Sequence, residues 1–251
     1  MNAIKVTWAL FVHYEKLLIR NPYWILSALF QPVCYLYLFA PLLQNVLGDS
    51  GGVSPINQFT PGLLVMVSLF GAMYVGFGII EYLRSGVIER LRVTTASRVS
   101  LLMGMVLRDV VTLLIQAFIV IFLAMPLGLT ISPIGILLSA AIMVMIGFFM
   151  SPVSYALALT VKSEDALGPI LNFFSQPMLL LSGVLLPLTL APAWLLNVSY
   201  FNPVKYMVDA SRAIFNGDLS NPAVWQGFLL MGVLVVAAFW WSMRCMKKAM
   251  E

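Results

Sequence analysis

The sequence contains few charged residues and almost none of the side chains that bind metals or form disulfides. Of its 251 residues only 10% are charged, whereas 61% are hydrophobic, and it has one histidine and two cysteines. His13, Cys34 and Cys245 cannot supply a zinc cluster or a disulfide framework. The high apolar content also argues against a soluble domain, because such domains average roughly 45–50% apolar residues. We therefore expect lipid to be the solvent for most of these side chains.

Motifs that would let the chain catalyse a reaction or power transport are also missing. No G-x-x-x-x-G-K-[ST] run is present, so the chain has no P-loop for a nucleoside triphosphate. No histidine lies deep in an apolar run to activate a serine, which argues against an intramembrane hydrolase. Glu81 and Asp109 are expected at helix ends, and the middle of each apolar run lacks the ionisable groups of an ion-coupled carrier. These absences favour a non-catalytic transporter whose energy comes from another protein.

Six apolar runs are long enough to cross a bilayer, which takes about 20 helical residues. They cover residues 23–46, 59–81, 104–129, 134–161, 168–188 and 222–243. Before the last run, Pro192 and Pro203 divide residues 189–221 into apolar pieces too short to span, so we expect re-entrant or interfacial helices there. The sequence predicts an all-α polytopic membrane protein with six transmembrane helices.

Lysine and arginine are distributed unequally between the two sets of connecting segments. They occur before the first run, between the second and third, and after the fourth and sixth, whereas the opposite set carries only Lys205 and Arg212. Because positive residues remain in the cytoplasm, we predict that both termini are cytoplasmic. Topology accounts for the net charge of +4, so nothing in that charge indicates a nucleic-acid partner.

Residues 1–21 are expected to form an amphipathic helix in the cytoplasmic membrane interface. Charged residues, among them Glu15 and Lys16, interrupt the region where a cleavable signal peptide would have its apolar core. One face of the helix would meet lipid and the other would meet water. Membrane anchoring alone explains this pattern, and contact with a cytoplasmic partner is the alternative.

Residues 81–98, EYLRSGVIERLRVTTASR, form a charged segment between the second and third runs. As a helix this segment would have one apolar face, formed by Leu83, Val87, Ile88 and Leu91. Its polar face would carry Arg84, Ser85, Glu89 and Arg92. A solvated loop that only sets topology does not need the apolar face. The alternative is a short helix that fills a groove on a soluble partner.

Methionine and aromatic residues cluster in the second and fifth runs. These residues are Phe70, Met73, Tyr74, Phe77, Phe173, Phe174 and Met178. Ordinary helix packing explains such clusters. The alternative is a route for a large apolar substrate, because methionine and aromatic surfaces adapt to varied shapes.

Three stretches carry a resemblance to a known family. The first is Glu81 with the run Arg84-Ser85-Gly86-Val87-Ile88-Glu89-Arg90-Leu91-Arg92-Val93-Thr94 and then Ser97-Arg98. The second, opening the second apolar run, is Phe59-Thr60-Pro61-Gly62, and the third is Asn202-Pro203-Val204-Lys205-Tyr206 with Asp209 and Arg212. In order and spacing they resemble the type 2 permeases of ATP-binding cassette exporters, especially the daunorubicin exporter permease group. Gly86-Val87-Ile88-Glu89 stands where a Gly-Thr-Leu-Glu-like run is usual in that group, and Thr95 stands where proline is common.

The resemblance implies one permease domain over residues 1–251. Its parts would be the interfacial helix (1–21), spans one to five (22–188), an extracytoplasmic re-entrant segment (189–221), span six (222–243) and a cytoplasmic tail (244–251). It also implies a dimer with a second permease copy, identical or related, bound to two ATP-binding cassette ATPase subunits. Those subunits would carry ATP and magnesium, and this chain would need no cofactor of its own.

The resemblance also assigns roles to individual residues. Residues 84–98 would contain a coupling helix that docks in the ATPase, and its polar contacts would be Arg84, Glu89, Arg90 and Arg92. Spans one and five of two protomers would line the substrate path. The extracytoplasmic gate would comprise Asn202, Pro203, Tyr206, Asp209 and Arg212. Within that gate, Asp209 and Arg212 are three residues apart and are expected to neutralise each other.

The predicted function is a permease subunit in a bacterial or archaeal cytoplasmic membrane that exports a hydrophobic or amphipathic compound, such as a drug, an antibiotic or a lipid-like molecule. Export of a polysaccharide or a teichoic-acid-type polymer is the alternative within the same superfamily. An intramembrane enzyme would need a deep polar dyad, and an ion-coupled carrier would need charge in mid-membrane.

Overall fold

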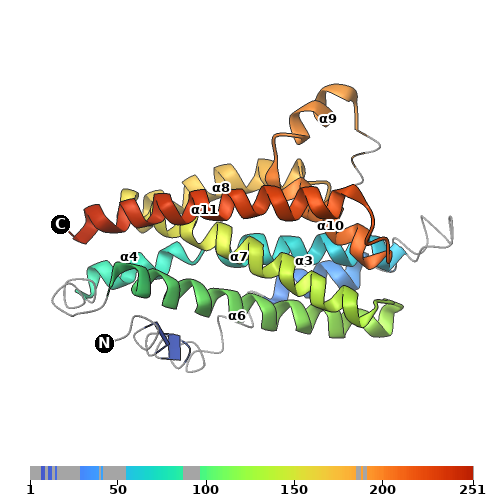
Figure 1. Cartoon of the computed structure of the whole chain (residues 1–251), viewed down its shortest axis with the longest axis horizontal. Helices are drawn as coiled ribbons and strands as arrows, with labels where there is room; N and C mark the ends of the chain where they lie inside the picture. Colours follow the sequence, from blue (N-terminus) through green and yellow to red (C-terminus); the bar gives the residue numbers. More distant parts are fainter. Residues whose placement is uncertain are drawn as a thin grey trace.

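The computed structural model describes residues 7–8, 11–12, 15, 29–39, 41, 55–86, 97–184, 188 and 191–250. Regular structure within these ranges is entirely helical, which confirms the predicted all-α class. In chain order the labelled helices are α3 (Pro55–Met73), α4 (Gly76–Arg84), α6 (Arg98–Ala124), the 3-10 helix η1 (Met125–Leu127), α7 (Pro133–Val161), α8 (Glu164–Leu180), α9 (Ala193–Ser199), α10 (Pro203–Phe215) and α11 (Pro222–Met250). A further helical stretch is Leu29–Phe39. The long helices run side by side along one axis (Figure 1).

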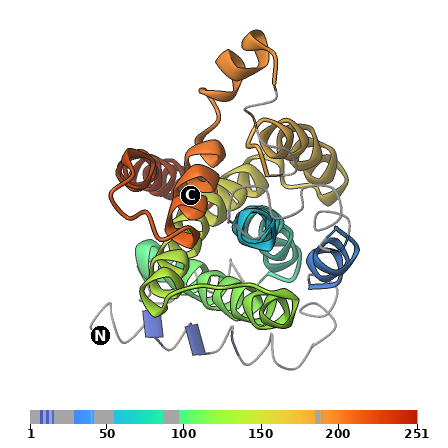
Figure 2. The same ribbon diagram turned by 90° about the vertical axis from the view of Figure 1, so that its right-hand side faces the viewer.

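Helix α7 lies at the centre of this bundle, with the other long helices around it when the bundle is viewed along its axis (Figure 2). It contacts α3, α4, α6, α8, α10 and α11. Small residues let neighbours approach its backbone closely, as membrane helices often require. A Cβ atom at Gly147, for example, would lie 2.9 Å from the Val110 side chain of α6. The position of α7 therefore sets the position of most other elements.

Polar caps and prolines fix where three helices begin. The side chains of Ser97, Ser132 and Asn202 accept backbone amide hydrogen bonds of 3.0–3.1 Å in the first turns of α6, α7 and α10. Pro133 and Pro203 occupy first-turn positions, where a helix needs no amide donor. These signals are local and depend only on residues close together in the sequence.

Four of the six predicted spans correspond to helices long and apolar enough to cross a membrane: Ile56–Arg84, Val99–Leu127, Pro133–Val161 and Pro222–Lys248. The predicted fifth span corresponds to α8, whose 17 residues make a helix of about 25 Å. It begins at Glu164 and ends at Leu180, before the predicted end at residue 188. Of the predicted first span, the structure describes 29–39 and Pro41. A total of six spans therefore remains a prediction.

The alternating helix directions give the bundle two ends (Figure 1). We call them the α4 end, with the last turns of α4, α7 and α11, and the α10 end, with η1, α9 and α10. The lysines and arginines of the described loops and helix ends divide as predicted. Those at the α4 end are Arg84, Arg98, Lys162, Arg244, Lys247 and Lys248, and those at the α10 end are Lys205 and Arg212. That the α4 end faces the cytoplasm remains a prediction.

Candidate functional site

The second predicted span is broken in the middle. Helix α3 ends at Met73 and α4 begins at Gly76, with a turn between them. The Ser154 hydroxyl of α7 accepts a hydrogen bond from the Gly76 amide at 2.9 Å and donates one to the Met73 carbonyl. Both backbone groups would have been bonded within an unbroken helix. One serine therefore stabilises the break and fixes its position against α7.

The far end of α4 is joined to α8 by an ion pair. Arg84 Nη1 lies 3.0 Å from Glu164 Oε1, and the two side chains are 60% and 40% exposed. Of the four predicted ATPase contacts, Arg84 is therefore placed at the α4 end with a partner inside the chain. The other three, Glu89, Arg90 and Arg92, lie outside the described residues.

Three of the predicted path residues form a continuous aromatic row along α3 and α4. The Tyr74 ring stacks between Phe70, 6.3 Å away, and Phe77, 6.2 Å away, measured between ring centroids. The Tyr74 hydroxyl donates a 2.8 Å hydrogen bond to Asn172 Oδ1 of α8. Because Tyr74 also sits in the turn between α3 and α4, the row connects the helix break directly to α8.

The remaining predicted path residues are divided between the core and the surface. Met73 is only 4% exposed and belongs to the hydrophobic core. Phe173 and Phe174 of α8 are 73% and 53% exposed and meet edge to face. Met178 is half-buried. The structure therefore presents the phenylalanines of α8 outward, whereas Met73 packs among the helices.

At the α10 end, the predicted gate residues Arg212 and Asn202 bind backbone groups of other elements. Arg212 donates to the Gly183 carbonyl at 2.6 Å and to the Gln58 carbonyl at 3.3 Å. Asn202 donates to the Met178 carbonyl of α8 at 2.6 Å. These bonds attach α10 and the turn before it to the end of α8 and the start of α3.

Asp209 and Arg212, which were expected to neutralise each other, do not form an ion pair with each other in the structure. Asp209 instead pairs with Lys205, one helical turn earlier, at 2.9 Å. Arg212 donates its hydrogen bonds to backbone carbonyls and not to Asp209. Burial lowers the pKa of Arg212, and the charge of Asp209 only opposes that shift.

Two other predicted gate residues have local roles. Pro203 begins α10, and the Tyr206 hydroxyl donates to the Tyr200 carbonyl at 3.1 Å. The Lys205 ammonium lies over the Tyr200 and Tyr206 rings, 4.8 and 5.3 Å from their centroids. The predicted gate residues therefore lie in one short segment. Among them, Arg212 and Asn202 form hydrogen bonds with residues that are distant in the sequence.

Sequence reasoning missed a buried polar cluster between α6 and α7. Asp109 is 3% exposed, and its carboxylate lies 2.6 Å from Arg108 Nη2 and accepts a 2.5 Å hydrogen bond from the Tyr155 hydroxyl. The expectation that Asp109 lies at a helix end is wrong, because Ser97 caps α6 and the helix already begins at Arg98. Adjacent opposite charges in an apolar run, with a tyrosine in the next run, were the available signal.

The N-terminal segment approaches this cluster at Glu15. Burial raises the pKa of the Glu15 carboxyl, and the charges of Arg108 and Asp109 also act on it. Both oxygens of Asp109 are already bonded by Arg108 and Tyr155. Such a saturated carboxylate suits an ion pair that holds helices together better than the dyad of an intramembrane enzyme.

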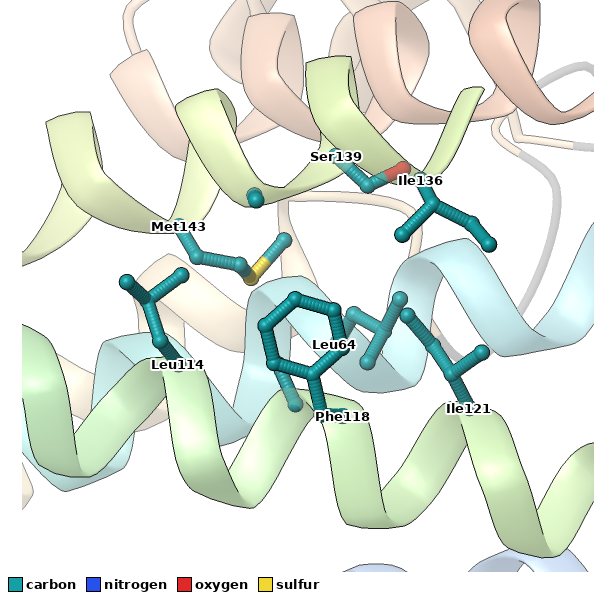
Figure 3. Close-up of a pocket in the computed structure, with 9 residues that line it drawn as sticks. Leu64, Leu114, Phe118, Ile121, Ile136, Ser139 and Met143 are labelled. Atoms are coloured by element: carbon teal, nitrogen blue, oxygen red, sulfur yellow. The ribbon is translucent and has the colours of Figure 1, made fainter. Parts of the chain in front are cut away.

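A small pocket lies where α3, α6 and α7 meet (Figure 3). Its volume is about 10 Å³ and its lining is largely apolar, with Leu64, Phe118, Ile121 and Met143 directed toward it. Drug-sized ligands need roughly 300–1,000 Å³. This pocket is therefore a packing gap and not a substrate site.

Comparisons with known proteins agree with this architecture. The family described as ABC-2 type transporter matches residues 5–216. The chain is 27% identical over 214 residues to the transport permease ycf38 of Cyanophora paradoxa, with 82% of this chain and 74% of the relative covered. It is 21% identical over 198 residues to the daunorubicin resistance ABC transporter permease protein DrrB1 of Streptomyces coeruleorubidus, with 78% and 70% covered. It is 25% identical over 183 residues to the multidrug ABC transporter permease YbhR of Escherichia coli K12, with 71% and 48% covered.

Proposed function

The chain belongs to the ABC-2 type transporter family, and from this we propose that it exports a hydrophobic or amphipathic compound with energy from separate ATPase subunits. The family match confirms the resemblance inferred from the sequence. The chain is a multi-pass membrane protein and a transport permease by its family and its apolar helices. Export as the direction, an amphipathic compound as the substrate and a bacterial or archaeal cytoplasmic membrane as the location are parts of the proposal.

The observation that carries the proposal is the connection from α4 to α8. Helix α4 has nine residues and is separated from α3 by the break at Ser154. Its far end is paired with Glu164 in the first turn of α8, and its near end meets α8 through Tyr74 and Asn172. A push on the loop after α4 would therefore move α4 about the break and displace α8 at two points.

The proposed source of that push is an ATPase subunit bound to residues 84–98, with Arg84, Glu89, Arg90 and Arg92 as polar contacts. Two such subunits, each using ATP and magnesium, would act on two permease copies. Both the number of subunits and the pairing of permeases are proposals drawn from the resemblance. In this arrangement the chain itself performs no catalysis.

The proposed substrate surface is the aromatic face shared by α3, α4 and α8. Phe70, Tyr74 and Phe77 form its row, and Phe173 and Phe174 extend it outward. The relatives' names mention daunorubicin resistance and multidrug transport, which supports an amphipathic compound over a polymer. A second chain facing α8 would complete the path.

Transport by the reconstituted complex tests the proposal. The chain and an ATP-binding cassette subunit are placed in vesicles, and ATP-dependent movement of a fluorescent amphipathic dye is measured. Alanine at Glu89 and Arg92 together should abolish stimulated ATP hydrolysis and the co-purification of the two proteins. Alanine at Phe70, Tyr74 or Phe174 should change the range of dyes moved, whereas Phe201→Ala, at an exposed position of the α10 end, should not. Movement of a labelled polysaccharide but no dye would favour the polymer alternative instead.

A further inference from the structure

The outer face of α11 carries an apolar stripe that the described part of the chain leaves exposed. It consists of Trp225, Leu229, Val233, Val236 and Trp240, all between 58% and 75% exposed. The spacing of three or four residues places them on one side of the helix. Tryptophan ends the stripe on both sides, about 22 Å apart along the helix. Because tryptophan favours the two membrane interfaces, these two residues suit positions near the two edges of the hydrocarbon.

Helix α11 ends at the α4 end of the bundle (Figure 1). A basic groove begins there, one turn beyond Trp240. The Arg244 guanidinium carbon lies 3.6 Å from the centroid of the Trp240 ring, a stacked cation–π contact. The groove has a volume of about 490 Å³. Its lining is formed by Trp241, Arg244, Cys245, Lys247 and Lys248.

We propose that this groove binds the phosphate headgroup of an anionic phospholipid. Among the described residues, Arg244 and the two lysines line it and no carboxylate does, so its charge is complementary to a phosphate diester. The contact with Trp240 holds the guanidinium group of Arg244 in place over the ring. The N–H groups at the edge of the guanidinium can then donate two parallel hydrogen bonds to a phosphate. The two lysines, in the last turn of α11, would add positive charge.

Position favours a lipid over another anionic partner. The groove continues the lipid-facing stripe of α11, and Arg244 lies only about 6 Å along the helix from the interfacial Trp240. At that depth a lipid phosphate is the anion present at highest concentration, and basic pockets at helix ends are known to take such headgroups. The acyl chains of the same lipid would lie along the stripe, so one molecule would occupy both features.

Native mass spectrometry of the purified full-length chain in neutral detergent tests this proposal. Dioleoylphosphatidylglycerol and dioleoylphosphatidylcholine are added separately. The wild-type chain should retain phosphatidylglycerol about tenfold more tightly or better, and the triple variant R244Q, K247Q, K248Q should reduce this preference to about twofold or less. Arg244→Gln alone should already weaken the preference, and its matched control Lys162→Gln, which removes one positive charge at the same end but outside the groove, should keep it. Trp240→Leu keeps every charge and should weaken the preference about threefold through loss of the stacking contact.

Three results would overturn the assignment. One is an unchanged preference in the triple variant, with the thermal unfolding midpoint confirming that the protein is folded. A second is displacement of the lipid by millimolar glycerol 3-phosphate, which would show a site for soluble phosphate. The third is normal lipid retention by the triple variant with loss of ATPase co-purification, which would make the groove a protein contact. None of these measurements requires transport, so the lipid site can fail or stand independently of the proposed function.

Discussion

The two ends of the bundle are held together differently in the part of the chain that the structure describes. At the α10 end, Asn57 forms three hydrogen bonds with Thr130, and Arg212 bonds two carbonyls from other elements. At the α4 end, α4 is joined to α8 by the exposed pair of Arg84 and Glu164. Leaving a buried hydrogen-bonding group unpaired costs about 1–3 kcal/mol, whereas an exposed ion pair contributes about 0–1 kcal/mol.

This difference indicates which end moves. The ion pair that joins the far end of α4 to α8 can break with little loss of free energy, although Ile79 and Ile80 bury the middle of α4 in the core. We infer that work enters at the α4 end and that the α10 end serves as the fixed base against which α4 turns. Four substitutions would break or sharpen this contrast.

The largest expected loss of stability lies between the two ends, at Asp109. Asp109→Ala removes the carboxylate that joins Arg108 of α6 to Tyr155 of α7, and breaking a buried ion pair costs about 3–5 kcal/mol. We expect a loss of that size in the free energy of unfolding, measured by denaturation in mixed micelles. Glu81→Ala, which removes an exposed carboxylate near the end of α4, should change it by less than about 0.5 kcal/mol. Similar small losses in both variants would show that the cluster does not hold α6 against α7.

The next largest effect is expected at the α10 end. Asn57→Ala removes three hydrogen bonds and leaves the backbone amide and carbonyl of Thr130 without their partner. The expected loss is about 2–3 kcal/mol in the same assay. Asn197→Ala, at an exposed position of α9, is the control and should be nearly neutral. If Asn57→Ala is as mild as its control, the α10 end is not the fixed base.

Local signals allowed much of the fold to be predicted from the sequence. Apolar length located four spans, and the prolines at 192 and 203 correctly indicated that the segment before α11 contains only short helices. The uneven distribution of lysine and arginine predicted which loops share an end of the bundle. Each of these features depends on residues close together in the chain.

Features that depend on contacts between helices could not be predicted in the same way. The break after Met73 is fixed by Ser154, 81 residues later, and although Gly76 and Gly78 follow the break, nothing near them in the sequence identifies the serine that stabilises it. Arg212 was expected to bind Asp209 because the two are close in sequence, yet it binds carbonyls 29 and 154 residues away. Asp109 was also expected at a helix end, because the predicted span began where the apolar run begins, at residue 104. The helix in fact begins earlier, at the polar cap Ser97, which a search for apolar residues does not detect.

The break itself provides the third prediction. Ser154→Ala leaves the Met73 carbonyl and the Gly76 amide unbonded in the core, and the expected loss of stability is about 1–2 kcal/mol. Because α4 then loses its fixed pivot, transport should fall more than ATP hydrolysis in the reconstituted complex. Ser139→Ala is the matched control, since Ser139 is also buried on α7 but bonds only the Gly135 carbonyl of its own helix. Equal effects of the two variants on the ratio of transport to hydrolysis would argue against a pivot at Ser154.

The smallest effect on stability is expected at the α4 end, where the effect on coupling should be large. Arg84→Ala breaks the exposed pair with Glu164 and should cost less than about 1 kcal/mol. Transport per ATP hydrolysed should nevertheless fall severalfold, because α4 no longer pulls on the first turn of α8. Exchanging the two charges in the double variant R84E, E164R should restore part of the coupling, while Lys162→Ala at the same end should leave it unchanged. A large loss of stability would show that α4 is part of the fixed base. Unchanged coupling would instead mean that the displacement reaches α8 only through Tyr74 and Asn172.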